Sequence, residues 1–391
     1  MVVPLQNTIR DYAWGSHTAL PELLGVQPDG KPQAELWMGA HESAPSVLPT
    51  GDTLYDAVSA DAGAVLGAET AERFDGRFPF LAKLLAAGQP LSIQAHPSRE
   101  QAIDGYRRDE EADVPRDAAD RNYKDAWPKP EILIALEPFD ALVGFRPLDR
   151  TVALLDALAP AGFGELTDLL RNGKLREAFT DFMSRDRDAI RPMVGALGEA
   201  VAQYAGDAFP LERETLSKLC ADFQDDPGVL AALLLNRVRL QRFDAVYLPA
   251  GNVHAYLHGL GFEVMANSDN VLRGGLTAKH IDVPELVSVV DFEPLDNPVL
   301  TATPAGNGVA TYDTGCEYFA IHRVELDDDE RTVEGVGPRI VCCVDGSVSV
   351  VDAAGKESAV TLPAGRSAFA SGTEGPCTLR GSGTAFVVSA R

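Results

Sequence analysis

Polar side chains share one face of a short predicted strand at residues 91–96 (LSIQAH). Ser92, Gln94 and His96 alternate there with apolar residues. Because the side chains of a strand point alternately to opposite faces, these three project together. A polar face of this kind cannot be buried against an apolar core without partners, so it must meet either water or a ligand. Gln94 and His96, two residues apart, could hold one metal ion from a single strand.

Two further segments repeat this pattern. Lys129 and Glu131 share a face in KPEILIAL, and His254, Tyr256 and His258 share a face in NVHAYLH. Two histidines, a carboxylate and an amide oxygen would make a mixed nitrogen and oxygen site, suited to Zn²⁺ or another divalent first-row ion with an open position. Each residue alone also has an ordinary explanation, since a strand glutamine usually only forms hydrogen bonds and a single histidine is seldom a ligand. The metal interpretation depends on their joint placement in a chain with seven histidines.

The elements that must position these side chains fall into three stretches. Short apolar runs up to residue 147 predict strands at 91–96, 130–136 and 141–145, a possible short helix at 80–87, and a solvated helix and loop at 99–126. From 148 to 242, including 230–240, the apolar period is helical and predicts five or six structural helices. Strand patterns return at 243. From 306 onward, short strands every ~10–15 residues indicate a small antiparallel barrel or jelly roll.

One four-residue sequence occurs twice in the β regions. Leu-Pro-Ala-Gly stands at 248–251 and again at 362–365, each time after a run typical of a strand. His254 lies three residues after the first glycine, and Ala368 lies three residues after the second. This repeat predicts two related β-barrels, of which the second has lost the histidine.

Composition limits the setting and the partners. A chain of 391 residues suggests two or three domains. A net charge of -24 disfavours nucleic acid and anionic membranes as partners, so an anionic substrate would need a local Lys and Arg cluster. The N-terminus lacks the pattern of a secretory signal, and no apolar run approaches the ~20 residues that span a bilayer. Five cysteines without a CxxC pattern predict a reducing, cytoplasmic setting, and leave a metal to histidine and oxygen ligands.

Several long motifs resemble the type I mannose-6-phosphate isomerases. They are NTIRDYAWGS, AELWMGAHESAPS, FLAKLLAAGQPLSIQAHP, KPE, YLPAGNVHAY and FEVMANSDNVLRGGLTAKHIDV, in that order along the chain. The resemblance implies a mainly β fold: a metal-binding cupin-type jelly roll (1–147 and 243–305), an inserted helical domain (148–242), and a second cupin-like domain without metal (306–391). It also implies one Zn²⁺ per chain, a sugar-phosphate substrate, and a cytoplasmic monomer in carbohydrate metabolism. The implied reaction interconverts mannose 6-phosphate and fructose 6-phosphate through an enediol, toward either mannose use or GDP-mannose synthesis.

The resemblance assigns roles residue by residue. The implied metal ligands are Gln94, His96, Glu131 and His254. The implied catalytic residues are Arg273, which stabilises charge, Lys129, which transfers a proton, and Glu263 and Asp269, which face the sugar. Tyr256 and Trp14 are implied sugar neighbours, and the residues implied to receive the phosphate are Lys83, Ser92 and Lys279.

Two positions depart from the family pattern. Pro128 stands where the family usually has histidine, which removes any role for an imidazole there, and Glu42 stands where proline is common. Pro128 slightly favours an alternative, a cupin protein that binds a metal and a sugar phosphate without turnover, whereas Arg273 and Lys129 favour catalysis. Another cupin enzyme, such as a metal-dependent oxygenase, would need a redox metal and often three histidines, and two are available here.

Overall fold

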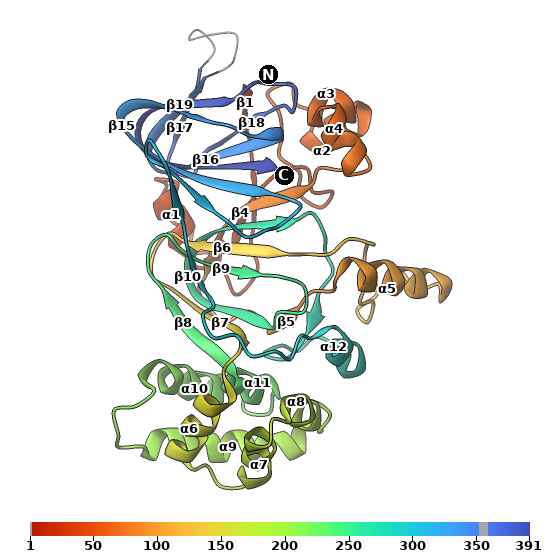
Figure 1. The fold of residues 1–391 in the computed structure, drawn as a ribbon, viewed down its shortest axis with the longest axis vertical. Helices are drawn as coiled ribbons and strands as arrows, with labels where there is room; N and C mark the ends of the chain where they lie inside the picture. The colour runs from red at the N-terminus through yellow and green to blue at the C-terminus, as the bar shows by residue number, and fades with distance from the viewer. Residues whose placement is uncertain (1, 352–358) are drawn as a thin grey trace.

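The computed structural model describes residues 2–351 and 359–391. The described chain forms two β-sheets and a group of helices, which follow one another along the long axis of the molecule (Figure 1). One sheet lies at the top of that view, the other in the middle, and the helices at the bottom. The fold is therefore mainly β with a helical insert, as the sequence predicted.

The middle sheet carries every segment in which metal ligands were predicted. Its main path runs β12-β9-β6-β10-β4-β3-β2, and β5, β7, β8 and β11 join it through β10. The strands that lie here are β2 (Thr8–Arg10), β3 (Glu35–Met38), β4 (Phe80–Ala87), β5 (Gln94–Ala95), β6 (Glu131–Ala135), β7 (Phe139–Phe145), β8 (Leu235–Leu240), β9 (Asp244–Leu248), β10 (His254–Ala266), β11 (Leu272–Arg273) and β12 (Val299–Thr301). The long strand β10 pairs with β4, β5, β6 and β7, so it links the predicted ligand segments.

The upper sheet is built mainly from the C-terminal part of the chain. Its path runs β1-β18-β16-β19-β15-β14-β13, and β17 pairs with β16. The strands are β1 (Val2–Leu5), β13 (Thr303–Gly306), β14 (Val309–Tyr312), β15 (Ala320–Val333), β16 (Val336–Val351), β17 (Val360–Pro363), β18 (Ser367–Ala370) and β19 (Cys377–Ala390). Because β1 pairs with β18, the first residues of the chain lie in this sheet, although the sequence analysis placed 1–147 as a whole in the metal-binding unit.

The two sheets share an apolar core. Phe262 of β10 stacks on Phe386 of β19, with ring centroids 4.7 Å apart. Both rings are fully buried, and Ile132 and Ile340 belong to the same cluster. Burying apolar surface between the sheets stabilises both, so the upper sheet supports the one that carries the candidate site.

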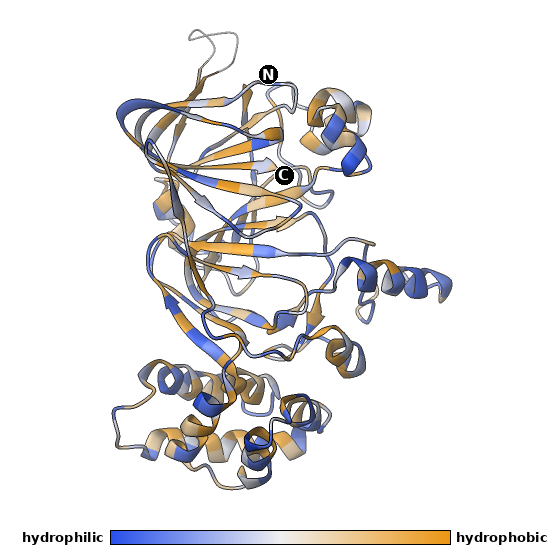
Figure 2. Cartoon of the chain, in the orientation of Figure 1, coloured by the Kyte–Doolittle hydropathy of each residue, from blue (hydrophilic) through white to orange (hydrophobic). Residues whose placement is uncertain are grey.

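Six helices of the described chain form the group at the bottom of Figure 1. They are α6 (Leu148–Leu158), α7 (Gly164–Arg171), α8 (Leu175–Met183), α9 (Arg187–Gln203), α10 (Pro210–Asp222) and α11 (Gly228–Leu234). Their apolar stripes face inward, where Phe179 and Leu197 are fully buried, and their outer faces are hydrophilic (Figure 2). This agrees with the helical period of the sequence.

Shorter helices lie around the sheets. These are α1 (Ala19–Leu23), α2 (Leu54–Ala60), α3 (Ala62–Leu66), α4 (Ala68–Arg73), α5 (Arg99–Glu111) and α12 (Val283–Val289). Ser98 and Gln101 form a capping box at the start of α5, which is the solvated helix predicted within 99–126. Among residues 2–351 and 359–391, every helix is too short or too polar to cross a membrane.

Three local predictions were wrong. Residues 80–87 form the strand β4 rather than a helix, because all eight are buried between β3 and β10, and a short continuous apolar run suits either element. Residues 235–240 form β8, paired with β7, so the helical pattern ends at Leu234. Only Gln94 and Ala95 of the segment 91–96 have strand geometry.

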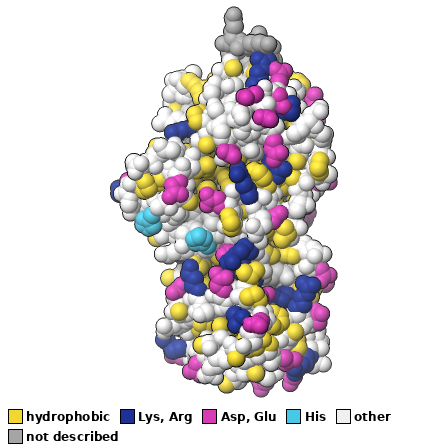
Figure 3. Space-filling view, turned by 90° about the vertical axis from the view of Figure 1, so that its left-hand side faces the viewer, with side chains coloured by type: hydrophobic (Ala, Val, Ile, Leu, Met, Phe, Trp, Pro, Cys, Tyr) yellow, Lys and Arg dark blue, Asp and Glu magenta, His cyan; other side chains and the backbone are white. Residues whose placement is uncertain are grey.

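Charged side chains are distributed over the surface. On the face shown in Figure 3, acidic and basic side chains are interspersed among the described residues. The whole chain has an acidic excess, with 58 Asp and Glu against 34 Lys and Arg, but this excess does not prevent cationic side chains from grouping locally. The candidate site contains one of them.

Candidate metal centre and active site

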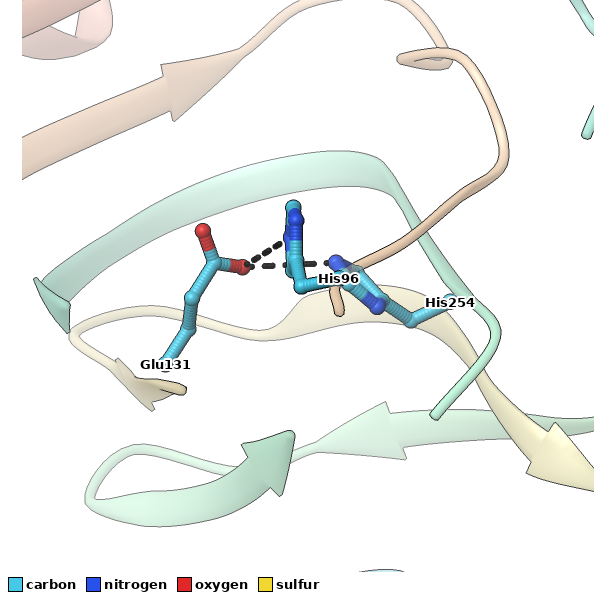
Figure 4. Close-up of side chains that lie close together, drawn as sticks. All are labelled: His96, Glu131 and His254. Atoms are coloured by element: carbon cyan, nitrogen blue, oxygen red, sulfur yellow. Dashed lines mark ion pairs between the residues drawn. The ribbon is translucent and has the colours of Figure 1, made fainter. Parts of the chain in front are cut away.

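Three buried side chains converge inside the middle sheet. Glu131 Oε2 lies 3.4 Å from His96 Nε2 and 3.3 Å from His254 Nε2 (Figure 4). Glu131 begins β6, His254 begins β10, and His96 directly follows β5, so three separate segments supply the cluster. Their candidate ligand atoms all lie within 4.8 Å of one another, which is the spacing that a single metal ion requires.

The two imidazoles are oriented by their other nitrogens. His96 Nδ1 lies 2.7 Å from the Asn270 carbonyl oxygen, and His254 Nδ1 lies 3.1 Å from the Asn252 carbonyl oxygen. A proton on each Nδ1 would satisfy these carbonyls and leave the Nε2 lone pairs directed at the cluster. Both Nε2 atoms are buried without a hydrogen-bond partner. Burial also lowers the pKa of His96 to about 4, which keeps its ring in the neutral form that binds metals.

Gln94 projects toward the same cluster. It lies opposite His254 in the pairing of β5 with β10, and opposite Arg273 in the pairing of β5 with β11. Residues directly opposite in antiparallel strands project from the same face of the sheet. Gln94, His254 and Arg273 therefore share one face, and the amide of Gln94 could serve as a fourth ligand beside the two imidazoles and the carboxylate.

Lys129 contacts the other oxygen of the Glu131 carboxylate. The two side chains form a buried ion pair through Lys129 Nζ and Glu131 Oε1. Burial by itself would raise the pKa of Glu131, but the neighbouring charge of Lys129, together with His96, holds it well below its ordinary value. The carboxylate is thus ionised at neutral pH, with one oxygen toward Lys129 and the other toward the histidines.

Deeper in the sheet, Lys83 is enclosed by carboxylates. Its Nζ lies 2.9 Å from Glu263 and 3.3 Å from Glu35, and all three side chains are buried. The two carboxylates raise the pKa of Lys83 against the opposing effect of burial, whereas burial raises the pKa of Glu263. The Tyr256 hydroxyl lies beside this group, and its pKa is raised by burial and then by Glu263.

This placement separates Lys83 from the other residues expected to receive a phosphate. A lysine already paired with two buried carboxylates has no free charge for an additional anion. Lys83 is also absent from the lining of the cavity that contains Ser92 and Lys279. We therefore reassign Lys83 to the internal charge network with Glu35 and Glu263.

A cavity of about 340 Å³ opens on the Arg273 side of the cluster. It is lined by Trp14, Ser92, Gln94, Arg273 and Lys279, which are all sequence-predicted site residues. The charge of Arg273, and then burial, lowers the pKa of Lys279, as expected for two neighbouring cations. Neither cation has a carboxylate partner among the described residues, so together they form the local positive position that an anionic substrate requires. We call this space the mouth cavity.

The structure adds an aromatic residue to the mouth cavity. Tyr12 lines it beside Trp14, and the two rings stack with centroids 5.7 Å apart. The Arg10 guanidinium lies over the Tyr12 ring, 5.4 Å from its centroid. Tyr12 lies in the motif NTIRDYAWGS, from which only Trp14 was predicted to be a sugar neighbour.

Asp269 lies away from the mouth cavity. It lines a neighbouring cavity of about 190 Å³ with His41, Glu42 and Arg116. Its Oδ1 is 3.3 Å from His41 Nε2. Burial by itself would raise the pKa of Asp269, but the hydrogen bond from His41 brings it to about 2. Asp269 is therefore an ionised carboxylate on another side of the loop that leads to Arg273.

His258 and Pro128 do not join the metal cluster. The pairing of β10 with β7 shifts between Tyr256 and His258, so His258 leaves the face of His254 and is exposed; the predicted shared face was wrong there. Pro128 is buried just before Lys129. In the described chain, the position at which the family pattern has histidine thus supplies no ligand atom.

Sequence reasoning missed two buried residues that hold the site together. The side chain of Asn270 accepts a hydrogen bond from Lys124 N and donates to the Asp125 and Trp127 carbonyls, while its own carbonyl orients His96. The Asp125 carboxylate accepts from Asp269 N at 3.0 Å. Both residues join the segment before Lys129 to the segment before Arg273. The polar residues in NSDN and KDAW were visible in the sequence. Nothing in the sequence indicated that these two distant segments pair with each other.

A family model, curated relatives and solved structures all place this chain beside the same group of proteins. Residues 2–148 match the family model "Phosphomannose isomerase type I, catalytic domain". The chain is 38% identical to the mannose-6-phosphate isomerases of Shigella flexneri and Escherichia coli strain K12, over 97% of this chain and 97% of each relative. A solved mannose 6-phosphate isomerase bound with zinc and yttrium is 36% identical with a TM-score of 0.91, over 100% of this chain and 99% of that chain.

A second solved structure comes from Salmonella typhimurium. It is a mannose 6-phosphate isomerase described as bound to substrate (fructose 6-phosphate) and zinc, with 36% identity, a TM-score of 0.91 and the same coverage. The likeness extends over the whole length, including the helical insert and the upper sheet. By sequence and by fold, the chain belongs to the type I phosphomannose isomerase family.

Proposed function

We propose that this protein interconverts mannose 6-phosphate and fructose 6-phosphate with the help of one zinc ion. The observation that carries the proposal is the buried His96–Glu131–His254 cluster, with two unpartnered Nε2 atoms, beside a cavity that contains two unpaired cations. The relatives named mannose-6-phosphate isomerase favour this function over a protein that only binds its ligand.

The donor set fits zinc. Two neutral imidazoles, one carboxylate and one amide oxygen form a four-ligand set of the kind Zn²⁺ accepts. We assign these roles to His96, His254, Glu131 and Gln94. Bound zinc would supply positive charge that polarises the sugar oxygens next to the reacting carbons.

The mouth cavity binds the substrate by its phosphate. Lys279 and Ser92 line its wall, and we assign them to the phosphate, which anchors the sugar without reacting. Trp14 and Tyr12 offer an aromatic surface to the apolar edges of the sugar. Tyr256 and Glu263 lie further inside, where the reacting end of the sugar would be held.

The reaction moves a proton between two neighbouring carbons, and negative charge develops on oxygen. We assign stabilisation of that charge to Arg273, whose guanidinium remains protonated and is therefore unsuited to act as a base. Lys129 and Glu263 are the candidates for holding and moving the proton, since both are buried next to the cluster. Asp269, on the neighbouring side of the loop, would orient His41 rather than contact the reacting carbons.

We further propose a three-part organisation and a cytoplasmic monomer. The parts are the metal-binding unit (1–147 and 243–305), the helical insert (148–242) and the second cupin-like unit (306–391). Two strands pair outside their own part: β1 pairs with β18 of the second cupin-like unit, and β8 pairs with β7 of the metal-binding unit. The five cysteines are all free thiols in the described chain, which suits a reducing compartment.

The deciding experiment is a coupled assay for fructose 6-phosphate formed from mannose 6-phosphate. Purified protein should show turnover that a chelator removes and that added zinc restores. Protein with one bound zinc per chain and no turnover would instead support the alternative, a cupin that binds a metal and a sugar phosphate without catalysis.

A further inference from the structure

A single buried carboxylate connects the helical insert to the mouth cavity. Asp226, just before α11, is only 3% exposed. Its Oδ1 accepts hydrogen bonds from Gly228 N at 2.7 Å and from Leu276 N at 2.8 Å, and its Oδ2 accepts one from Thr277 N at 3.0 Å. Two of these donors belong to a segment 50 residues further along the chain. A buried carboxylate with this many N–H donors is a strong local anchor.

The anchored segment carries the cationic wall of the mouth cavity. It follows Arg273, and both Thr277 and Lys279 line the cavity. Lys279 N donates to Thr277 Oγ1 at 3.1 Å. The position of Lys279 thus follows that of Thr277, and the position of Thr277 follows that of Asp226.

The other edge of the segment is held by the residue just before β5. Gly274 N donates to the Ile93 carbonyl at 2.7 Å, and Ile93 N donates to the Gly275 carbonyl at 3.0 Å. Ile93 lies between Ser92 and Gln94. The segment 274–279 is therefore held on one side by the metal-binding sheet and on the other by the helical insert.

The segment needs such an anchor because its backbone is unfavourable. Leu276 has a φ of +53°, a region that residues with a side chain seldom adopt. Gly228 and Gly275 pack so closely that a Cβ on either one would collide with the backbone of the other segment. The hydrogen bonds that the backbone N–H groups of Leu276 and Thr277 donate to the Asp226 carboxylate offset the cost of this conformation.

We propose that Asp226 is a positioning residue for the substrate phosphate, through which the helical insert sets the place of Thr277 and Lys279. This rests on the proposed function, because it takes Lys279 to be a phosphate ligand. The chemistry occurs elsewhere, at Arg273 and the metal cluster. Loss of the anchor should therefore weaken substrate binding more than it slows the bound substrate.

The test replaces Asp226 in the zinc-loaded enzyme. Asp226→Asn keeps the size but presents an NH₂ group to one backbone N–H, so at least one hydrogen bond is lost and two donors oppose each other. We expect KM for mannose 6-phosphate to rise by about 10–100-fold while kcat changes less than about threefold, since a weakened contact to the non-reacting phosphate affects the binding of substrate and transition state alike. Backbone hydrogen exchange in 274–280 should become faster, whether or not substrate is present.

Asp225→Asn is the matched control. Asp225 is the neighbouring carboxylate, but it pairs with Arg187 and Arg191 of the helical insert, at 3.1 and 2.7 Å. This variant should leave both KM and exchange in 274–280 unchanged. If Asp226→Asn behaves like Asp225→Asn, or if it lowers only the melting temperature, Asp226 is not a positioning residue.

A second variant covers the case in which Asp226→Asn does not fold. Thr277→Val removes only the hydroxyl that accepts from Lys279 N, and it should raise KM with little change in kcat; an unchanged KM would overturn the proposal. An inactive zinc-loaded wild-type enzyme would instead refute the proposed function. The exchange measurement would still decide whether Asp226 anchors the segment.

Discussion

The two Leu-Pro-Ala-Gly turns share the backbone conformation of their glycine, but one leads to a charged interior and the other to an apolar one. The first connects β9 to β10 and the second connects β17 to β18. Gly251 has a φ of +79° and Gly365 a φ of +77°, so both glycines adopt the left-handed conformation that other residues adopt at a cost. Three residues later, the first turn leads to buried His254 and the second to buried Ala368.

The interiors reached by these turns differ in kind. Around His254 the middle sheet buries the neutral imidazole of His96 beside the ion-paired charges of Glu131, Lys129 and Lys83. Around Ala368 the upper sheet buries an apolar cluster that includes Val341, Val348 and Leu362. Buried charges stabilise a fold poorly, whereas apolar burial does so well. The turn therefore sets the place of the residue three positions after its glycine. The side chains around that residue determine whether it can take part in a metal site.

The largest effect should follow removal of both histidines from the first interior. The double variant His96→Ala, His254→Ala should contain no stoichiometric zinc, and its turnover should fall by more than about 10⁴-fold, because it loses two ligands and the charge they hold. Metal analysis and the coupled assay measure both effects. His322→Ala is the control, because His322 lies in the upper sheet with its Nδ1 3.0 Å from the Thr311 hydroxyl; this variant should retain zinc and activity. Full zinc occupancy in the double variant would eliminate the proposed centre.

Arg273→Ala should have the next largest effect. If its charge acts on the developing oxyanion, kcat should fall by about 10²–10⁴-fold, on the order of 3–5 kcal/mol, with a smaller change in KM. Arg273→Lys should restore only part of the activity, since an ammonium group lacks the planar fork of the guanidinium. Steady-state kinetics with zinc content checked would measure this. A change confined to KM would remove Arg273 from the catalytic step.

Lys279→Ala should affect binding rather than chemistry. Loss of one phosphate contact should raise KM for mannose 6-phosphate by about 10–100-fold and leave kcat within a few-fold, because the phosphate does not react. Lys218→Ala, an exposed lysine in α10, is the control and should change neither constant. An equal loss of kcat in Lys279→Ala would place that lysine at the reacting end of the sugar.

The sequence predicted those parts of the site that depend on local alternation. Strand alternation grouped Gln94 with His96 and Lys129 with Glu131; the structure brings both segments together at His254, although His96 and Lys129 lie just outside β5 and β6. The helices of the insert followed in the same way from their apolar period. The family resemblance supplied Arg273, which lies opposite Gln94.

The remaining features depend on contacts that no local pattern encodes. The bulge after Tyr256, which moves His258 to the surface, is a mismatch between two strands and not a property of one. The resemblance assigned Lys83 to the phosphate, and its pairing with Glu35 and Glu263 on other strands could not be derived from the segment around it. Asp226 and Asn270 hold segments that are far apart in sequence, and a single Asp or Asn in a loop looks the same whether it faces water or a buried backbone.

The smallest effect should follow transfer of the histidine to the second turn. Ala368 is fully buried in the apolar cluster of the upper sheet. Ala368→His should destabilise this sheet by about 2–6 kcal/mol, because overpacking costs about 1–3 kcal/mol and a buried unpaired ring nitrogen costs about 1–3 kcal/mol more. Ala368→Leu should show the overpacking cost alone, so the difference between their denaturant midpoints isolates the polar part. Neither variant should bind a second zinc ion, since the candidate ligands in the described cluster around residue 368 are the thiols of Cys343 and Cys377, and burial raises the pKa of both to about 11, which disfavours the thiolate form that binds metals. If Ala368→His did bind zinc in stoichiometric amount, the turn alone would be sufficient to make a metal site, and the charged interior around His254 would have to serve the substrate rather than the metal.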